Sequence, residues 1–474
     1  MRAPSKGQLR PRSLLEVCWR EMQALRPAFS HQATFMWFAT IVIGFMVRSD
    51  FLGVTSIVRA LNLKPKCYDS LLGNFHSRAI NLDQLAVQWT KLALKLFRPV
   101  HVLGHLIFIG DGKKVQKTGK HIPSVKKLRQ DASTKPEYIM GHSMQALCLL
   151  VSAASTFFAV PLVIRIHEGL VRSNRGKKTL IDKMLDLIKT LQVNESIYFV
   201  GDAYYANGKM ALGLLEMGHD IVSRVKSNAV AFSPAEQPKD GRKRGRPAVY
   251  GKKIPLKSLF CIDPMIEVAS PIYGETNVMI RYHVCDLLWR PVGRLVRFVA
   301  VVHPVRGACL LMSTDMSLDT TRIIHIYGLR FKIEHTFKQA VWQMGAFFSH
   351  FWMEALKPLR PGCKNHNLHY ESPEYRAQVD RKMNAYHTFM QAAFIAHGLV
   401  QYLSVAFPKL VWASFGSWLR TIRPGIPPSE LVVREALRNT LPDFLVSCLQ
   451  TCCLAKFIAD RQNEDTMEIF RLAS

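Results

Sequence analysis

Residues 106–114 read Leu-Ile-Phe-Ile-Gly-Asp-Gly-Lys-Lys, and residues 197–205 read Ile-Tyr-Phe-Val-Gly-Asp-Ala-Tyr-Tyr. Each segment is a short apolar run, typical of a strand buried on both faces, followed by Gly and then Asp. The carboxyl ends of the strands in an α/β sheet are where ligands are held. A single Asp in such a place is often only a turn residue. The recurrence at Asp111 and Asp202 therefore predicts two carboxylates that lie together at one edge of a sheet and bind a hard cation.

The segments around these two aspartates predict an α/β core. Residues 144–151 and 156–166 are further strand-like runs. Residues 179–191 and 207–217 have the apolar spacing of amphipathic helices, and residues 220–225 return to a strand pattern. The resulting order is three strands, helix, strand, helix, strand, which is the layout of a ribonuclease-H-like α/β fold.

The rest of the chain divides by composition around this core. Residues 1–100 have helical apolar spacing, and residues 53–75 within them resemble a helix-turn-helix, although a helical hairpin without a DNA-binding role stays open. Residues 226–312 combine a loop rich in Pro, Lys and Arg with alternating, strand-like runs. The predicted parts are a helical N-terminal DNA-binding region (1–100), the first part of the core (101–225), an inserted β-rich subdomain with a basic loop (226–312), the second part of the core with the helix that carries Glu334 (313–405), and a helical C-terminal region (406–474).

A third carboxylate can come from a helix predicted over residues 319–342. One stripe of this helix is apolar and its neighbour is polar; the apolar residues are Ile326, Leu329, Ile333 and Phe337, and the polar residues are Tyr327, Arg330, Glu334 and Lys338. The polar stripe could be an exposed face with ion pairs at a spacing of four residues. Alternatively, Glu334 completes a metal site with the two aspartates, and Tyr327 and Arg330 bind a phosphate beside it. Asp315 and Glu168 also follow strand-like runs and are competing carboxylates.

The charge of the chain indicates a polyanionic partner. Its 474 residues include 63 Lys and Arg against 35 Asp and Glu, a formal net charge of +28, while 49% of the residues are apolar. A chain that can bury a core and still carries this excess is expected to bind nucleic acid first and an anionic membrane surface second.

Two clusters without acidic residues supply half of the net charge. One follows Asp111 and the other lies in the inserted region; their members are Lys113, Lys114, Lys117, Lys120, Lys126, Lys127 and Arg129, and Arg242, Lys243, Arg244, Arg246, Lys252, Lys253 and Lys257. Such clusters are often solvated loops, but one beside a proposed metal site is better explained as a DNA track. Residues 243–247 read Lys-Arg-Gly-Arg-Pro, which is similar to the AT-hook that enters a narrow minor groove.

Neither membrane insertion nor secretion is expected. The longest uncharged apolar runs are residues 33–47 and 146–163. The first is shorter than the roughly 18 residues of a span, and the second contains Pro and hydroxyl residues. No apolar stretch follows the basic residues 1–12, and ten cysteines at irregular spacing do not form a disulfide scaffold.

At Asp111, Asp202 and Glu334 the sequence resembles the bacterial insertion-sequence transposases of the DDE class, in the branch with an insertion between the second Asp and the Glu. The Tyr-x2-Arg-x3-Glu pattern of that branch matches Tyr327, Arg330 and Glu334. The resemblance extends from about residue 35 to 405, and its blocks are GDGKKVQKTGKHIPSVKKL, GHSMQAL, IRIHEGL, FVGDAYYA, SRVKSNAVAF, STDMSLD and YGLRFKIEHTFKQ.

The resemblance implies a role for each matching residue. Asp111, Asp202 and Glu334 would be the catalytic, metal-binding triad, and Tyr327 and Arg330 would grip DNA. The family pattern has a Lys seven residues after the Glu, where this chain has Val341. Lys338, one helical turn earlier, could bind phosphate in its place.

The resemblance also implies a reaction. The triad of this family binds two Mg²⁺ or Mn²⁺ ions, which need oxygen ligands. Two such ions, roughly 3.5–4 Å apart, activate a water or a 3′-hydroxyl and stabilise the leaving oxygen. The protein would cleave transposon ends and join them to target DNA as a dimer, in the bacterial cytoplasm beside the nucleoid.

Two other functions stay open on the sequence alone. A transposase-derived protein that binds DNA without activity is compatible with Val341, although the complete triad argues against it. A ribonuclease-H-like nuclease or resolvase would cleave DNA without strand transfer.

Overall fold

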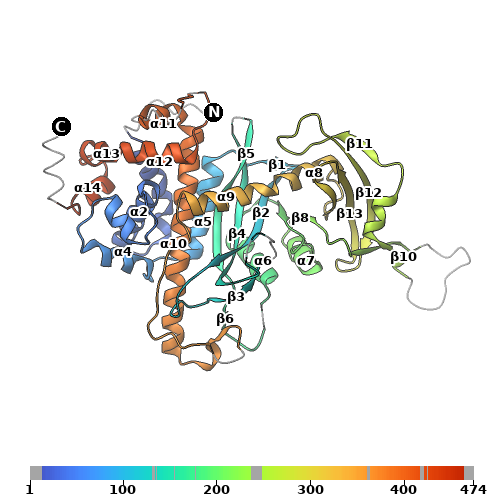
Figure 1. The fold of residues 1–474 in the computed structure, drawn as a ribbon, viewed down its shortest axis with the longest axis horizontal. Coiled ribbons are helices and arrows are strands. Elements are labelled where there is room, and N and C mark those ends of the chain that lie inside the picture. Colours follow the sequence, from blue (N-terminus) through green and yellow to red (C-terminus); the bar gives the residue numbers. More distant parts are fainter. Residues whose placement is uncertain are drawn as a thin grey trace, which may run out of the picture.

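The computed structural model describes residues 13–463 except 131–133, 135, 154, 177, 236–247, 360–362, 417–420 and 424. A body of helices forms one end of the elongated molecule, a mixed sheet crosses its middle, and further strands form the other end (Figure 1). The helices are α1 (Leu14–Met22), α2 (Gln32–Val47), α3 (Thr55–Ala60), α4 (Cys67–Phe75), α5 (Leu82–Leu96), α6 (Leu180–Thr190), α7 (Gly208–Glu216), α8 (Thr320–Gly328), α9 (Lys332–Trp342), α10 (Pro373–Ala406), α11 (Pro408–Phe415), α12 (Glu430–Asn439), α13 (Leu441–Ser447) and α14 (Cys453–Ala459).

Within the described residues, thirteen strands belong to one sheet with the main order β10-β9-β12-β13-β14-β8-β7-β2-β4-β3. The strands of this sheet are β1 (His101–Val102), β2 (His105–Gln116), β3 (Lys126–Arg129), β4 (Tyr138–Ala153), β5 (Thr156–Ile166), β7 (Ile197–Gly201), β8 (Asp220–Arg224), β9 (Val230–Pro234), β10 (Tyr250–Pro255), β11 (Ile266–Ala269), β12 (Met279–Trp289), β13 (Arg294–His303) and β14 (Gly307–Ser313). A separate parallel pair joins β6 (Leu170–Val171) to β15 (His366–Asn367).

The centre of the sheet has the strand order β5-β4-β2-β7-β8. Strand β4 is antiparallel to both β5 and β2, whereas β7 and β8 run parallel to β2. The predicted sequence of strands and helices in this part of the chain is confirmed, and α6 begins at the predicted position because Thr179 and Asp182 form a capping box. Helices α9 and α10 pack against β5. A mixed sheet with helices in this order is consistent with a ribonuclease-H-like core.

Residues 226–312 contain β9 to β13 and most of β14, and these strands extend the central sheet. Strand β14 is antiparallel to β8, with Leu311 opposite Arg224 and Ser313 opposite Val222. The backbone hydrogen bonds therefore continue from the core strands into the strands of this region.

The helices near the two chain ends form one body. Helix α2 contacts α10, α12 and α14, and α1 contacts α13. Because α2 is surrounded by these partners, twelve of its sixteen residues are buried, which explains why its sequence is apolar on every side.

The longest helix, α10, runs through the junction between this body and the sheet (Figure 1). Of the described helices, it alone is long and apolar enough to cross a membrane by length and composition. However, 83% of its most apolar window is buried inside the protein, so its apolar surface is already covered.

Candidate active site

The strand register brings Asp111 and Asp202 to the same level of the sheet. Strands β2 and β7 are parallel neighbours, with Ile109 opposite Val200. Asp111 lies two residues after Ile109, and Asp202 lies two residues after Val200. Both aspartates are therefore at the same edge of the parallel strands. Asp202 directly follows the last residue of β7, as predicted, but Asp111 lies inside β2, which pairs with β4 as far as Gln116.

The glycine before each aspartate makes room for one aromatic ring. A Cβ atom on Gly110 would lie 2.3 Å from Cε2 of Phe199, and one on Gly201 would lie 2.8 Å from Cε1 of the same ring. Phe199 is completely buried. The repeated Gly-Asp pattern is therefore explained by close packing of two strands around Phe199, in addition to the placement of the carboxylates.

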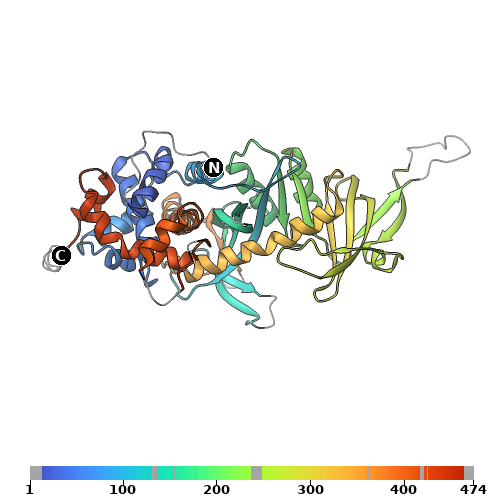
Figure 2. The same cartoon turned by 90° about the horizontal axis from the view of Figure 1, so that it is seen from above.

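Glu334 comes from a helix that is interrupted next to it. The predicted helix over residues 319–342 consists of α8, a single 3-10 turn over Leu329–Phe331, and α9. The four residues of the predicted apolar stripe are all buried, which confirms the predicted periodicity. Figure 2 shows α8 and α9 running in nearly one line along the sheet toward the helical body. Short 3-10 segments inside helices often lie at functional positions, and here the turn contains Arg330.

The three predicted carboxylates line one cavity of about 900 Å³. Asp111 and Asp202 enter it from the sheet, and Glu334 enters it from the first turn of α9. The turn that holds Asp202 is fixed by Ser223, whose hydroxyl donates a hydrogen bond of 2.8 Å to the carbonyl of Asp202.

Arg330 lies between two of these carboxylates. Its Nη1 is 3.4 Å from Oδ2 of Asp111, and its Nη2 is 2.7 Å from Oε1 of Glu334. The ion pair with Glu334 has the spacing of four residues that an exposed helix face would show. Because the same guanidinium also reaches Asp111, the polar stripe of the helix faces the aspartates and not only solvent.

The electrostatics of the cavity favour a cation. Burial raises the pKa of Asp111 to about 6, the Arg330 guanidinium opposes this rise, and the carboxylates of Asp202 and Glu334 add to it. Three carboxylates around one cavity supply the hard oxygen donors that Mg²⁺ and Mn²⁺ prefer, so the donor chemistry fits the predicted ions. Among the described residues, no three His, Cys, Asp or Glu side chains are grouped closely enough to hold an ion, and the guanidinium of Arg330 lies between Asp111 and Glu334.

The predicted DNA-contacting residues occupy different positions around this cavity. Lys113 and Lys114 line it, with Lys113 Nζ 5.7 Å from the ring centre of Phe337. Lys338 is exposed on α9 one turn after Glu334. Tyr327 does not line this cavity; together with Arg330 and Arg224 it lines another one. Val341, at the position of the family Lys, is partly buried against the core.

The expectation that Lys117 contacts DNA is wrong. Its side chain is only 4% exposed, and its Nζ donates hydrogen bonds of 2.5 and 2.7 Å to the carbonyls of Phe347 and Ser349. The segment after α9 covers this lysine, which a count of charges along the sequence cannot reveal. The predicted contacts of Arg242, Lys243, Arg244 and Arg246 lie outside the described residues.

The competing carboxylates have different positions. Asp315 accepts a hydrogen bond from the hydroxyl of Tyr198 near the start of β7, at the opposite end of that strand from Asp202. Glu168 lines the same cavity as the three predicted carboxylates and pairs with Lys126 at 2.9 Å.

Two further residues of the site were missed on the sequence. Gln145 on β4 donates to the hydroxyl of Tyr205 at 2.9 Å, and both side chains line the cavity. Both residues lie in segments that resemble the DDE transposases, GHSMQAL for Gln145 and FVGDAYYA for Tyr205, and this was the available signal. Neither residue was singled out, because the resemblance gives no role to these two positions.

Part of the chain matches a known protein family. The family model described as DDE superfamily endonuclease matches residues 24–259, roughly half of the chain. The matched region includes Asp111 and Asp202 and ends before Glu334. Among curated proteins, none matches this chain.

Proposed function

The chain belongs to the DDE superfamily of endonucleases, and from this premise we propose that it is a DNA transposase that cleaves at transposon ends and joins their 3′-hydroxyls to target DNA. One observation carries the proposal: Asp111, Asp202 and Glu334, from two parallel strands and one helix, line a single cavity together with Lys113 and Lys114. Carboxylates alone would repel a phosphodiester, whereas the lysines at the rim attract it.

In this proposal Asp111, Asp202 and Glu334 would hold two Mg²⁺ or Mn²⁺ ions, which would supply activation of the attacking oxygen and stabilisation of the leaving oxygen in a phosphoryl transfer. We propose that the guanidinium of Arg330, which pairs with Asp111 and Glu334, binds a phosphate of the DNA strand. Tyr327 contacts the DNA together with Arg330, and Lys338 binds a neighbouring phosphate in place of the family Lys that Val341 replaces.

The proposed partners are the terminal inverted repeats of the transposon and the target DNA. Two ends must be paired before joining, so the proposed active form is a homodimer. Its gene would lie in a bacterial insertion sequence. The protein would act in the bacterial cytoplasm, beside the nucleoid.

The test uses purified protein, Mg²⁺ or Mn²⁺, and DNA that carries the terminal repeats flanking the gene. The wild type is expected to cleave these ends and join them to a second DNA. Asp111→Asn, Asp202→Asn and Glu334→Gln are expected to lose both steps, by about 10²-fold or more, because each removes a ligand charge. Asp186→Asn, which changes an exposed carboxylate on α6 that pairs with Lys178, is the matched control and is expected to keep full activity.

The outcomes separate the alternatives. Cleavage without joining would identify a nuclease without strand transfer, and binding without cleavage would identify an inactive descendant of a transposase. Full activity in any of the three carboxylate variants would contradict the assignment of that residue.

A further inference from the structure

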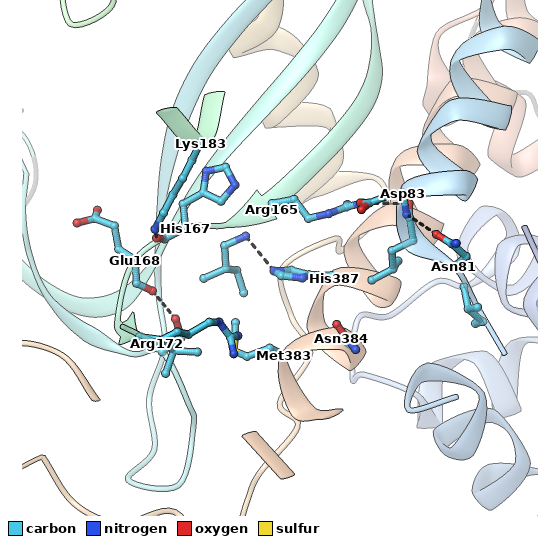
Figure 3. A pocket seen from close by; sticks show the side chains of 15 residues that line it. Asn81, Asp83, Arg165, His167, Glu168, Arg172, Lys183, Met383, Asn384 and His387 are labelled. Atoms are coloured by element: carbon cyan, nitrogen blue, oxygen red, sulfur yellow. Dashed lines mark hydrogen bonds and ion pairs between the residues drawn. The ribbon is translucent and has the colours of Figure 1, made fainter. Parts of the chain in front are cut away.

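A second cavity of about 520 Å³ lies beside the first, between the end of β5, the start of α5, α6 and α10 (Figure 3). It shares Glu168 with the cavity of the three carboxylates, but none of these three lines it. Its cationic side chains are Arg165, Arg172 and Lys183, which come from three separate parts of the chain. Neither the sequence resemblance nor the proposed reaction assigns a role to this cavity.

Arg165 is a buried, positively charged residue that lines the cavity. Its side chain is only 10% exposed, and its guanidinium donates to the carbonyls of Ile164 at 2.9 Å and Leu82 at 3.0 Å and to Oε1 of Gln391 at 3.1 Å. The nearest carboxylate is that of Asp83 at 3.5 Å, and its side chain is 74% exposed. Solvent therefore screens the one acidic partner of Arg165, and the guanidinium remains a buried positive charge next to the cavity.

The other two cations are not neutralised inside the cavity. The ammonium of Lys183 donates to the carbonyl of His167 and forms no ion pair with any residue in the described part of the chain. Arg172 pairs with Asp380, and both side chains are about half exposed. Glu168 directs its carboxylate away from Arg165 and His387 (Figure 3) and pairs with Lys126.

His387 adds a neutral donor. Its Nε2 accepts a hydrogen bond of 3.1 Å from the backbone N–H of Ile166, so the proton of the neutral ring is on Nδ1. No described residue accepts a hydrogen bond from this Nδ1–H. Burial, together with the charges of Arg165 and His167, keeps the pKa of His387 well below its usual value, so the ring stays neutral.

The cations of the cavity also act on one another. Burial lowers the pKa of Lys183, and Arg172 and Lys126 lower it further against the attraction of Glu168. Such mutual repulsion means that an anion placed among these groups would be stabilised by all of them at once.

We infer that this cavity binds a phosphate-class anion, held by the ammonium of Lys183, the guanidinium of Arg172 and the Nδ1–H of His387, with the buried charge of Arg165 attracting it from behind. These donors approach from different elements, which suits a tetrahedral group with several acceptor oxygens. The anion is either inorganic phosphate or a backbone phosphate of bound DNA. The inference does not depend on the proposed transposase activity, because binding is measured without cleavage.

The experiment titrates inorganic phosphate into the full-length protein in a calorimeter, without metal or DNA. Lys183→Gln and Arg172→Gln are each expected to weaken phosphate binding by about tenfold, the loss of one charge-assisted hydrogen bond. Lys178→Gln is the matched control, because Lys178 pairs with Asp186 and lines a third cavity of about 540 Å³ next to this one, but does not line this one. Equal unfolding midpoints for the three variants would show that they fold alike, and Arg172, at the exposed rim, is the variant least disturbing to the fold.

A second arm distinguishes the two sources of phosphate. DNA affinity is measured against salt concentration for the wild type and for the same variants. If the ligand is a DNA phosphate, the slope of log K against log salt falls by about one in Lys183→Gln and is unchanged in Lys178→Gln. If the ligand is free phosphate, the slopes are equal and phosphate still binds the protein–DNA complex. The inference is overturned if phosphate does not bind the wild type and the slopes are equal, or if phosphate binds the wild type and Lys183→Gln weakens this binding no more than Lys178→Gln does.

Discussion

Gly110 shows how a single residue fixes the position of a carboxylate. Its missing side chain lets β2 lie against the ring of Phe199, and the next residue is Asp111. In Gly110→Ala the new Cβ would lie 2.3 Å from a completely buried ring, which has no space to retreat. We expect a loss of about 1–3 kcal/mol in the free energy of unfolding, measured by urea denaturation.

Gly112→Ala is the control for this substitution. Its Cβ would meet only the carbonyl oxygen of Met144 at 3.7 Å, an ordinary contact. A stability equal to the wild type is expected for Gly112→Ala. If Gly110→Ala were equally stable, the packing explanation of the Gly-Asp pattern would be wrong.

Lys117 makes the stability of the protein depend on pH. Burial lowers its pKa from 10.5 to about 7 in the folded state. Below pH 7 the lysine is protonated in both states, and the cost of burying the charge is complete. Between about 7 and 10.5 the unfolded chain keeps the proton and the folded protein does not, so rising pH favours folding.

The test compares wild type with Lys117→Met at pH 7 and pH 9. Relative to the variant, the wild type should gain about 2 kcal/mol of unfolding free energy over this interval. Lys120→Met, at an exposed lysine three residues away, should show no such difference. A pH-independent difference between wild type and Lys117→Met would show that the buried lysine is not titrating.

At the scale of elements, two arginines of α12 donate hydrogen bonds to carbonyls at the C-terminal end of α2. The last carbonyls of a helix have no partner within it. Arg434 donates to the carbonyls of Met46 and Arg48, and Arg438 donates to the carbonyl of Val47 at 3.0 Å. A helix near one chain end is thereby joined to a helix near the other.

Arg434→Ala should therefore destabilise the whole protein. Arg434 is only 4% exposed, and its removal takes the donor from the carbonyl of Met46 and leaves that of Arg48 only the longer bond, 3.4 Å, from Nη2 of Arg438. A loss of about 2–4 kcal/mol is expected in chemical denaturation. Arg423→Ala, at an exposed arginine, should change stability by less than about 0.5 kcal/mol. If the two substitutions had equal effects, the hydrogen bonds from Arg434 to the end of α2 would not stabilise the protein.

The elements themselves could largely be predicted from local sequence, because their patterns are local. The apolar runs of β2 and β7 and the stripe of α8 and α9 are visible within about ten residues. The 3-10 turn at Arg330 could not be predicted, since the apolar spacing passes through it unchanged. The burial of Lys117 could not be predicted either, because the carbonyls that receive it come from residues more than two hundred positions away.

At the scale of the whole molecule, local sequence patterns do not reveal which strands pair or which side chains come together. The proximity of Asp111 and Asp202 could be predicted from the sequence, because each follows an equivalent apolar run. The contact of Arg330 with Asp111 and the pairing of β14 with β8 join segments far apart in the sequence. Alternation along β14 identifies a strand but carries no information about its neighbour.

The continuity of the sheet predicts that residues 226–312 are required for the stability of the rest. Their removal would expose the edge of β8, which β14 now covers at Arg224, Ser223 and Val222. An uncovered strand beside the core is prone to pair with other chains. A variant in which a short Gly-Ser linker replaces residues 226–312 is therefore expected to aggregate or to unfold at a lower urea concentration than the wild type. Its control replaces only residues 236–247, which leaves β9, β10 and the β14–β8 pairing in place, and is expected to stay monodisperse in size-exclusion chromatography. If the larger deletion were equally monodisperse and stable, the strands of this region would be an independent subdomain, and their pairing with β8 would contribute nothing to the fold.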